Sequence, residues 1–176
     1  MNRHDRIAKM SRAAGVIFNL KRLYIYGVPV LIHTDSNHLA FQQLSFLLER
    51  ELYLRDGDLA EANFELNKID FLPVVVLIVE DELPIACGAY RKYTDEAVEI
   101  KRMYVIPDHR RHKFASKILS ELELLAKSDG YQYSLLETGK NQPEAISFYL
   151  KYGYKPIERF GKYRQSANSV CFKKSL

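Results

Sequence analysis

A run of basic residues follows an apolar, strand-like stretch in the second half of the sequence. The stretch is Val98–Ile106, and after Pro107 the chain continues with His109, Arg110, Arg111, His112 and Lys113. We expect a helix to begin near Arg110, which makes this segment a turn from a strand into a helix. The first amide groups of a helix lack partners and lie at its positive end, so such a turn can bind phosphate. A solvated run of charges is the alternative interpretation.

The bulk composition limits the classes to which the chain can belong. With 176 residues, 47% of them hydrophobic, it is expected to fold as one compact domain. The apolar runs are too short to cross a membrane and no signal peptide is expected, which predicts a cytoplasmic location without a membrane partner. A net charge of +4 does not predict nucleic-acid binding. The spacing of Cys87 and Cys171 predicts two buried thiols and no metal site.

Hydrophobic periodicity predicts the elements on the N-terminal side of the basic turn. Two extended segments, Leu23–Tyr26 and Val28–His33, flank Gly27. A helix is expected from a cap at Asp35 or Ser36 to about Tyr53, and a weaker one follows. Three strands joined by tight turns then form an antiparallel meander. The weaker helix is predicted at Leu59–Ile69, and the strands at Leu72–Val79, Pro84–Tyr93 and Ala97–Ile106.

The C-terminal side alternates helices and strands. The helix after the basic turn buries one stripe and ends at Gly130, and a second helix has a proline in its first turn. The predicted elements are a strand at Tyr131–Glu137, a helix at Pro143–Tyr152, and strands at Tyr154–Glu158 and Ser169–Lys173. This order predicts an α+β domain with a mixed sheet.

Several segments together resemble the GCN5-related N-acetyltransferase (GNAT) superfamily in their order and spacing. They are the strand EIKRMYVIP, the helix after DHRRHKFA, the strand LLETG and the helix QPEAISFYLKYGY. The ending FGKYRQSANSVCFKK resembles a subgroup of small bacterial GNAT proteins. The resemblance implies an N-terminal extension at residues 1–28 and an acetyltransferase domain at residues 29–176.

The same resemblance implies a specific architecture and a co-substrate. The fold would be a central seven-stranded mixed sheet, flanked by about four helices and splayed between its fourth and fifth strands. Acetyl-coenzyme A would lie in that opening. The backbone of Met103, Tyr104 and Val105 would contact the pantetheine arm. The first two helices would form much of the acceptor pocket, and Phe160–Ser169 would close its other side.

The phosphate loop implied by the resemblance departs from the family pattern. It comprises Arg110, Arg111, His112, Lys113, Phe114 and Ala115. Arg110 and Ala115 fit the pattern, whereas Arg111 and Lys113 stand where relatives have glycine, which permits close backbone approach to the diphosphate. Lys113 either crowds that approach or turns outward and adds a contact. Gln142 stands where many relatives have an asparagine that contacts the cofactor.

The resemblance also implies roles in catalysis. Tyr149 matches the tyrosine that protonates the departing thiolate in many relatives, and a phenol can supply that proton. A core tyrosine on an amphipathic helix is the alternative. Glu99 and Glu137 are the two candidates for the general base, with Glu99 ranked slightly ahead. Each has an alternative role as a substrate-binding or strand-pairing carboxylate.

Together these features predict an N-acetyltransferase that transfers an acetyl group directly from acetyl-coenzyme A to the amine of a small molecule or peptide. The competing hypothesis is a non-catalytic acetyl-coenzyme A-binding or interaction module that kept the fold while its phosphate loop changed. A homodimer is among the expected assemblies, because many relatives are dimers. The acceptor amine itself is not predicted.

Overall fold

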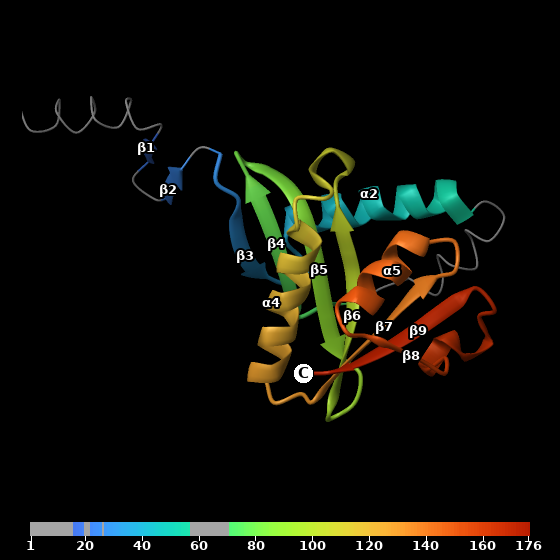
Figure 1. The fold of residues 1–176 in the computed structure, drawn as a ribbon. Coiled ribbons are helices and arrows are strands. Elements are labelled where there is room, and N and C mark those ends of the chain that lie inside the picture. The colour runs from blue at the N-terminus through green and yellow to red at the C-terminus, as the bar shows by residue number, and fades with distance from the viewer. Residues whose placement is uncertain (1–15, 20–21, 26, 57–70) are drawn as a thin grey trace, which may run out of the picture.

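A seven-stranded mixed sheet forms the centre of the molecule (Figure 1). The computed structural model describes residues 16–19, 22–25, 27–56 and 71–176. The strand order is β3-β4-β5-β6-β7-β9-β8, with β6 and β7 parallel and all other neighbours antiparallel. This confirms the predicted fold class. The strands are β3 (Val30–Thr34), β4 (Val74–Glu80), β5 (Leu83–Lys92), β6 (Ala97–Val105), β7 (Tyr133–Gly139), β8 (Lys155–Ile157) and β9 (Ser169–Ser175).

The segment before the large sheet forms a hairpin of its own. Strands β1 (Val16–Asn19) and β2 (Arg22–Ile25) pair antiparallel in a separate two-stranded sheet. Figure 1 shows this hairpin apart from the seven-stranded sheet. The amide of Gly27 donates a hydrogen bond of 2.9 Å to Asp81 in the turn between β4 and β5. The first strand of the large sheet, β3, begins at Val30.

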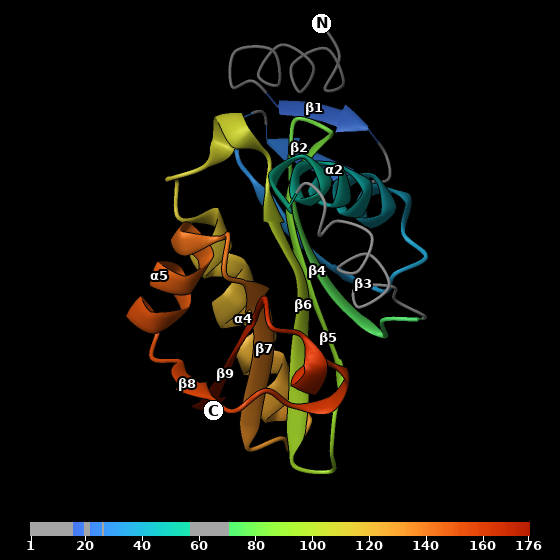
Figure 2. The ribbon, with the colours of Figure 1, turned by 90° about the vertical axis from the view of Figure 1, so that its right-hand side faces the viewer.

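Helices cover both faces of the sheet (Figure 2). Helix α2 (Leu39–Asp56) packs on one face, where Phe41 and Leu44 join a buried cluster with residues of β4 and β5. Helices α4 (Phe114–Ser128) and α5 (Pro143–Lys151) pack on the other. The buried residues of α4 fall on one stripe because an apolar residue recurs every three or four positions. They are Phe114, Ile118, Leu119, Leu122 and Ala126.

A glycine in the central strand β5 sets how closely α4 approaches the sheet. A Cβ atom built on Gly88 would lie 2.5 Å from a methyl carbon of Ile118 and 2.6 Å from the sulfur of Met103. Any larger residue would therefore push α4 outward. Because α4 supplies the N-terminus at the basic turn, Gly88 helps to position the site.

Two predicted helix starts were wrong. His38, and not Asp35 or Ser36, caps α2: its carbonyl accepts the first helical bond, and its Nδ1 accepts the amide of Ala40 at 3.2 Å. Asp35 and Ser36 instead bond to Asn37 and Leu72 outside the helix.

Helix α4 starts at Phe114 and not near Arg110, because the intervening backbone takes left-handed angles that an α-helix cannot contain. Three α-helices are described, against about four expected. The predicted helix at Leu59–Ile69 lies outside the described residues.

Strands β6 and β7 pair over only part of their length. Their register runs from Ala97 opposite Tyr133 to Ile100 opposite Leu136, and it ends there. Two residues later Arg102 has φ +57°, and the pairing of β6 with β5 shifts register at the same level. Such a bulge re-aims a strand. Beyond Ile100 the β7 side of β6 therefore has no strand partner among the described residues, which is the predicted splay.

Candidate active site

The divergence of β6 from β7 opens a cavity of about 590 Å³. Its walls come from the C-terminal half of α2, the end of β6, the basic turn, the start of α4 and the inner face of α5. Most of the residues singled out in the sequence meet here: Met103, Tyr104, Val105, Arg110, Arg111, Lys113, Phe114, Ala115, Gln142 and Tyr149. His112, Glu99 and Glu137 do not line this cavity.

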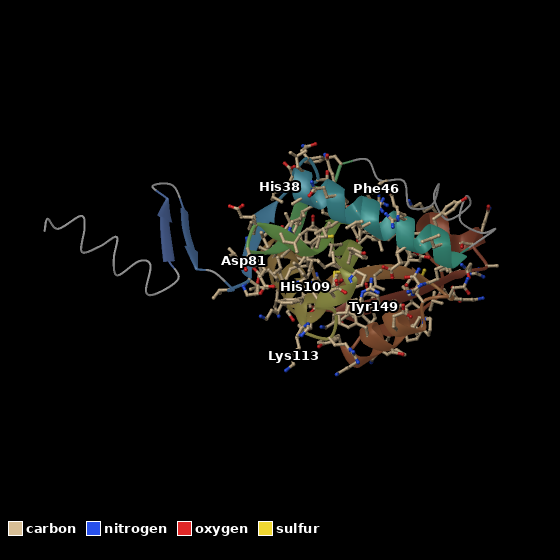
Figure 3. All side chains as sticks on the ribbon, turned by 90° about the horizontal axis from the view of Figure 1, so that it is seen from above. His38, Phe46, Asp81, His109, Lys113 and Tyr149 are labelled. Atoms are coloured by element: carbon tan, nitrogen blue, oxygen red, sulfur yellow. The ribbon has the colours of Figure 1, made fainter. Side chains whose placement is uncertain are left out.

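The basic turn keeps a glycine-like backbone although it lacks glycine. Arg111 has φ +67° and Lys113 has φ +66°. For a residue with a Cβ atom, this left-handed conformation costs about 1–2 kcal/mol. The side chain of Lys113 is exposed, and Figure 3 shows it projecting away from the body of the molecule. The lysine thus turns outward and leaves the backbone accessible.

This turn carries a row of unused amide donors beside the cavity. Residues 107–109 form a short 3-10 helix. In it, the amides of His109 and Arg110 donate hydrogen bonds to the carbonyl oxygens of Ile106 and Pro107. The amides of residues 111–116 donate no hydrogen bond to any residue in the described part of the chain. They lie at the positive N-terminus of the 15-residue helix α4. Such an arrangement binds anionic oxygens, and phosphate in particular.

Arg110 stands immediately before these amides and is held from three sides. Its Nε donates to the carbonyl oxygen of Val105 at 3.0 Å, and its guanidinium lies 5.7 Å from the centre of the Tyr104 ring. Its outer nitrogen donates to a carboxylate oxygen of Glu51 on α2 at 2.5 Å. The hydrogen bond with Glu51 raises the pKa of Arg110 above its ordinary value.

Tyr149 brings a protonated hydroxyl to the opposite wall. Its ring packs edge-on against Phe148 and Tyr154 and lies 6.2 Å from Phe172, which fixes its orientation. Figure 3 shows it beside the C-terminal half of α2. Burial, and secondarily the charge of Glu137, raise the pKa of Tyr149 above its ordinary value. The hydroxyl therefore keeps its proton at neutral pH, and no described residue accepts that proton in a hydrogen bond.

Glu99 lies in a buried cluster of charges on the opposite face of β6. Its carboxylate is 1% exposed and accepts hydrogen bonds from Arg91 at 2.8 Å and from the Tyr163 hydroxyl at 2.7 Å. Lys101 lies 3.4 Å from the same carboxylate. Burial alone would raise the pKa of Glu99, but Lys101, Tyr163 and Arg91 together hold it below its ordinary value. These partners stabilise the charged form of the Glu99 carboxylate.

Glu137 lies near this cluster but has fewer partners. It is half-buried near the end of β7, and the hydroxyl of Ser169 donates to it at 2.5 Å. Burial raises the pKa of Glu137, while Ser169 and Lys101 oppose the change without cancelling it. A carboxylate with a raised pKa binds a proton more readily near neutral pH. Of the two candidate carboxylates, Glu137 therefore has the surroundings that better suit proton uptake.

Gln142 occupies the N-cap position of α5 without capping the helix through its side chain. Its carbonyl oxygen instead accepts the hydroxyl of Thr138 at 2.9 Å. The amide nitrogen lies against the end of β7, where a Cβ atom on Gly139 would be 3.1 Å away. Gln142 thus contributes a side-chain donor to the cavity wall.

Comparisons with known proteins agree with this geometry. A family model described as an acetyltransferase (GNAT) domain matches residues 73–156. This match ties the segment from residue 73 to residue 156, just under half of the chain, to the GNAT family. The chain is 33% identical over 93 residues to an IAA acetyltransferase of Azospirillum brasilense, a stretch that covers 52% of this chain and 61% of that relative. The chain thus aligns with about three-fifths of the curated relative it matches.

Solved structures share the fold over most of the chain. A Klebsiella pneumoniae structure, described as a candidate acyl-CoA N-acyltransferase, is 25% identical, with a TM-score of 0.69 over 85% of this chain and 98% of that one. A GNAT acetyltransferase of Elizabethkingia anophelis, solved with acetyl-CoA bound, is 15% identical, with a TM-score of 0.60 over 84% and 98% of the two chains. The GNAT fold thus extends well beyond the matched segment.

Some residues at this site were missed by sequence reasoning. Glu51 and Arg55 of α2 reach the cavity, and Arg55 pairs with Glu144 of α5 as well as with Glu51. Their spacing of four residues is typical of a helical ion pair and was visible in the sequence. Their contacts to Arg110 and Glu144 join segments far apart along the chain, and no local pattern indicates them.

The described residues were searched for a metal site and for a membrane-spanning helix. Within them, no group of His, Cys, Asp and Glu side chains could hold a metal ion. No helix in this described part is long and apolar enough to span a membrane. Cys87 and Cys171 are buried free thiols, as expected.

Proposed function

We propose that this protein is an N-acetyltransferase that uses acetyl-coenzyme A to acetylate the amine of a small molecule or peptide. The observation that carries the proposal is the cavity between β6 and α5, with unpaired amides at one end and the Tyr149 hydroxyl in its wall. The amides could donate hydrogen bonds to the diphosphate of a ligand, and the cavity could hold its extended arm.

The residues of the cavity fit the parts of acetyl-coenzyme A. The free amides of residues 111–116 and the α4 N-terminus suit the diphosphate. The unpaired edge of β6 at Met103–Val105 suits the amide groups of the pantetheine arm, which can hydrogen-bond to it as another strand would. When bound, acetyl-coenzyme A supplies the activated acetyl group as a thioester.

Two side chains are assigned to proton transfer. Glu137 accepts a proton from the acceptor amine, which leaves the nitrogen lone pair free to attack the acetyl carbon. Tyr149 donates its hydroxyl proton to the sulfur as the carbon–sulfur bond breaks. Tyr149 belongs to the buried cluster on the α4–α5 face of the sheet. Glu137 lies outside the cavity lining, but its charge contributes to the raised pKa of Tyr149. This supports direct transfer without a covalent enzyme intermediate.

Binding and turnover of the full chain test the proposal together. Coenzyme A at a hundredfold excess over its Kd should add about 2.7 kcal/mol to the free energy of unfolding. Acetyl-coenzyme A and a panel of amines should then release free thiol, measured with a thiol-reactive dye. Glu137→Gln should lower this rate by about 10²-fold or more while binding is retained. A matched control is Glu158→Gln, an exposed carboxylate just after β8.

The results separate this proposal from the competing one. Binding without turnover on any amine, and no difference between wild type and Glu137→Gln, would favour a non-catalytic coenzyme-binding module. Absence of any stabilisation by coenzyme A or acetyl-coenzyme A would contradict both.

A further inference from the structure

The charges that line the cavity are unequal in number and in arrangement. Five of the lining residues are arginine or lysine, although the side chain of Lys113 projects outward: Arg55, Arg110, Arg111, Lys113 and Lys151. Two are acidic, Glu51 and Glu144, and each accepts a hydrogen bond from a lining arginine. The acidic residues therefore neutralise part of a surface that is otherwise built for an anion.

Glu51 accepts a hydrogen bond from the part of the Arg110 guanidinium that an anion in the cavity would contact. The inner part of the Arg110 side chain is fixed independently, by Val105 through Nε and by the ring of Tyr104. The outer nitrogen is the one that bonds to Glu51, at 2.5 Å. The unpaired amides begin at the next residue. A diphosphate bound to those amides would lie next to the same guanidinium.

We propose that the Glu51 carboxylate is an internal competitor for Arg110, and that a bound diphosphate takes Arg110 over from Glu51. This inference rests on the proposed function, because it assumes that the cavity receives coenzyme A. Charge-assisted hydrogen bonds of arginine to phosphate and to carboxylate have the same geometry, so one can replace the other. Glu51 therefore weakens coenzyme binding and eases release of coenzyme A.

The released carboxylate would not be left without a partner. Glu51 also accepts a hydrogen bond from Arg55 one helical turn further along α2, at 3.2 Å. Arg55 in turn pairs with Glu144 at the start of α5. The chain of pairs from Arg110 through Glu51 and Arg55 to Glu144 links the basic turn, α2 and α5 across the cavity. These pairs thereby connect the basic turn to α2.

The test compares two glutamates of the same helix, each paired with an arginine. Glu51→Gln removes the charge that faces the cavity. Glu49→Gln removes a charge that pairs with Arg102 at 2.5 Å and does not line the cavity. The affinities of coenzyme A and of pantetheine, which lacks the diphosphate, are measured by titration calorimetry for wild type and both variants. Unfolding curves without ligand check that each variant is folded.

Glu51→Gln should bind coenzyme A roughly twofold to fivefold more tightly than wild type, as expected for loss of a partly exposed competing ion pair. Its affinity for pantetheine should be unchanged, as should both affinities of Glu49→Gln. Unchanged or weaker binding of coenzyme A by Glu51→Gln would overturn the inference, and so would an equal gain for pantetheine. If wild type bound no coenzyme A at all, the proposed function would fail instead, which is a distinguishable result.

Discussion

The basic turn at Arg110–Lys113 and the charged cluster around Glu99 differ in how their polar groups are satisfied. The turn leaves a row of amides without partners and holds two residues in left-handed conformations. In the cluster, Glu99, Lys101 and Tyr163 bond to one another and are buried. Unsatisfied donors held at the cost of strain indicate a ligand site, whereas saturated charges indicate structure.

The largest effect that separates these regions is expected at Glu99. Glu99→Gln keeps the shape of the side chain but leaves the buried Lys101 without its counter-charge, which should cost about 3–5 kcal/mol of unfolding free energy in urea. The pKa of Glu99 is lowered by the fold, so the cost should be full at neutral pH and should shrink as pH falls below its ordinary value of 4.5. Asp95→Ala, which removes a fully exposed carboxylate, should leave the unfolding midpoint unchanged. Loss of turnover in folded Glu99→Gln protein would assign the general base to Glu99 and contradict the comparison.

Tyr149→Phe should lower kcat by about 10²-fold, or about 2.7 kcal/mol, because the departing sulfur loses its proton donor. The affinity for coenzyme A should remain, since the ring and its packing are kept. Steady-state kinetics and calorimetry measure the two quantities, with Tyr131→Phe as a control outside the cavity lining. A turnover rate equal to that of wild type would leave Tyr149 as a core aromatic residue only.

The raised pKa of Glu137 should appear as an acid limb in the pH profile of kcat/KM, with about a tenfold loss for each pH unit below that pKa. Glu137→Gln should lose this limb. Because the fold favours the protonated form, the contribution of Glu137 to stability is present at low pH and is lost as pH rises through its folded pKa. The variant should therefore gain stability over wild type as pH rises. An acid limb that persists in Glu137→Gln would point to another group.

The smallest effect concerns the strain in the basic turn. Lys113→Gly should raise the unfolding free energy by about 0.5–1 kcal/mol, because glycine relieves the left-handed backbone but loses more entropy on folding. Lys117→Gly, four residues later in α4, should lower it by about 1 kcal/mol. Equal destabilisation by both substitutions would show that the turn is not strained.

Much of this molecule could be predicted because its cues are local. The meander from Leu72 to Val105 follows from apolar runs and tight turns, and the stripe of α4 follows from its period. The start of α4 was placed too early because left-handed angles at Arg111 and Lys113 cannot be read from an arginine and a lysine, which rarely adopt them. The cap of α2 was misplaced because Ser36 bonds to Leu72, a residue 36 positions away.

In the candidate site, too, some features follow from the sequence and others depend on the tertiary structure. The sequence by itself determined the basic turn, the tyrosine on a short helix and the two carboxylates, since these depend on residue type and spacing. Only the tertiary structure distinguishes the surroundings of Glu99 from those of Glu137, because the pKa of a carboxylate depends on which charges the fold brings within reach. The tertiary structure also placed Glu51 against Arg110, a pairing of residues 59 positions apart that no local pattern records.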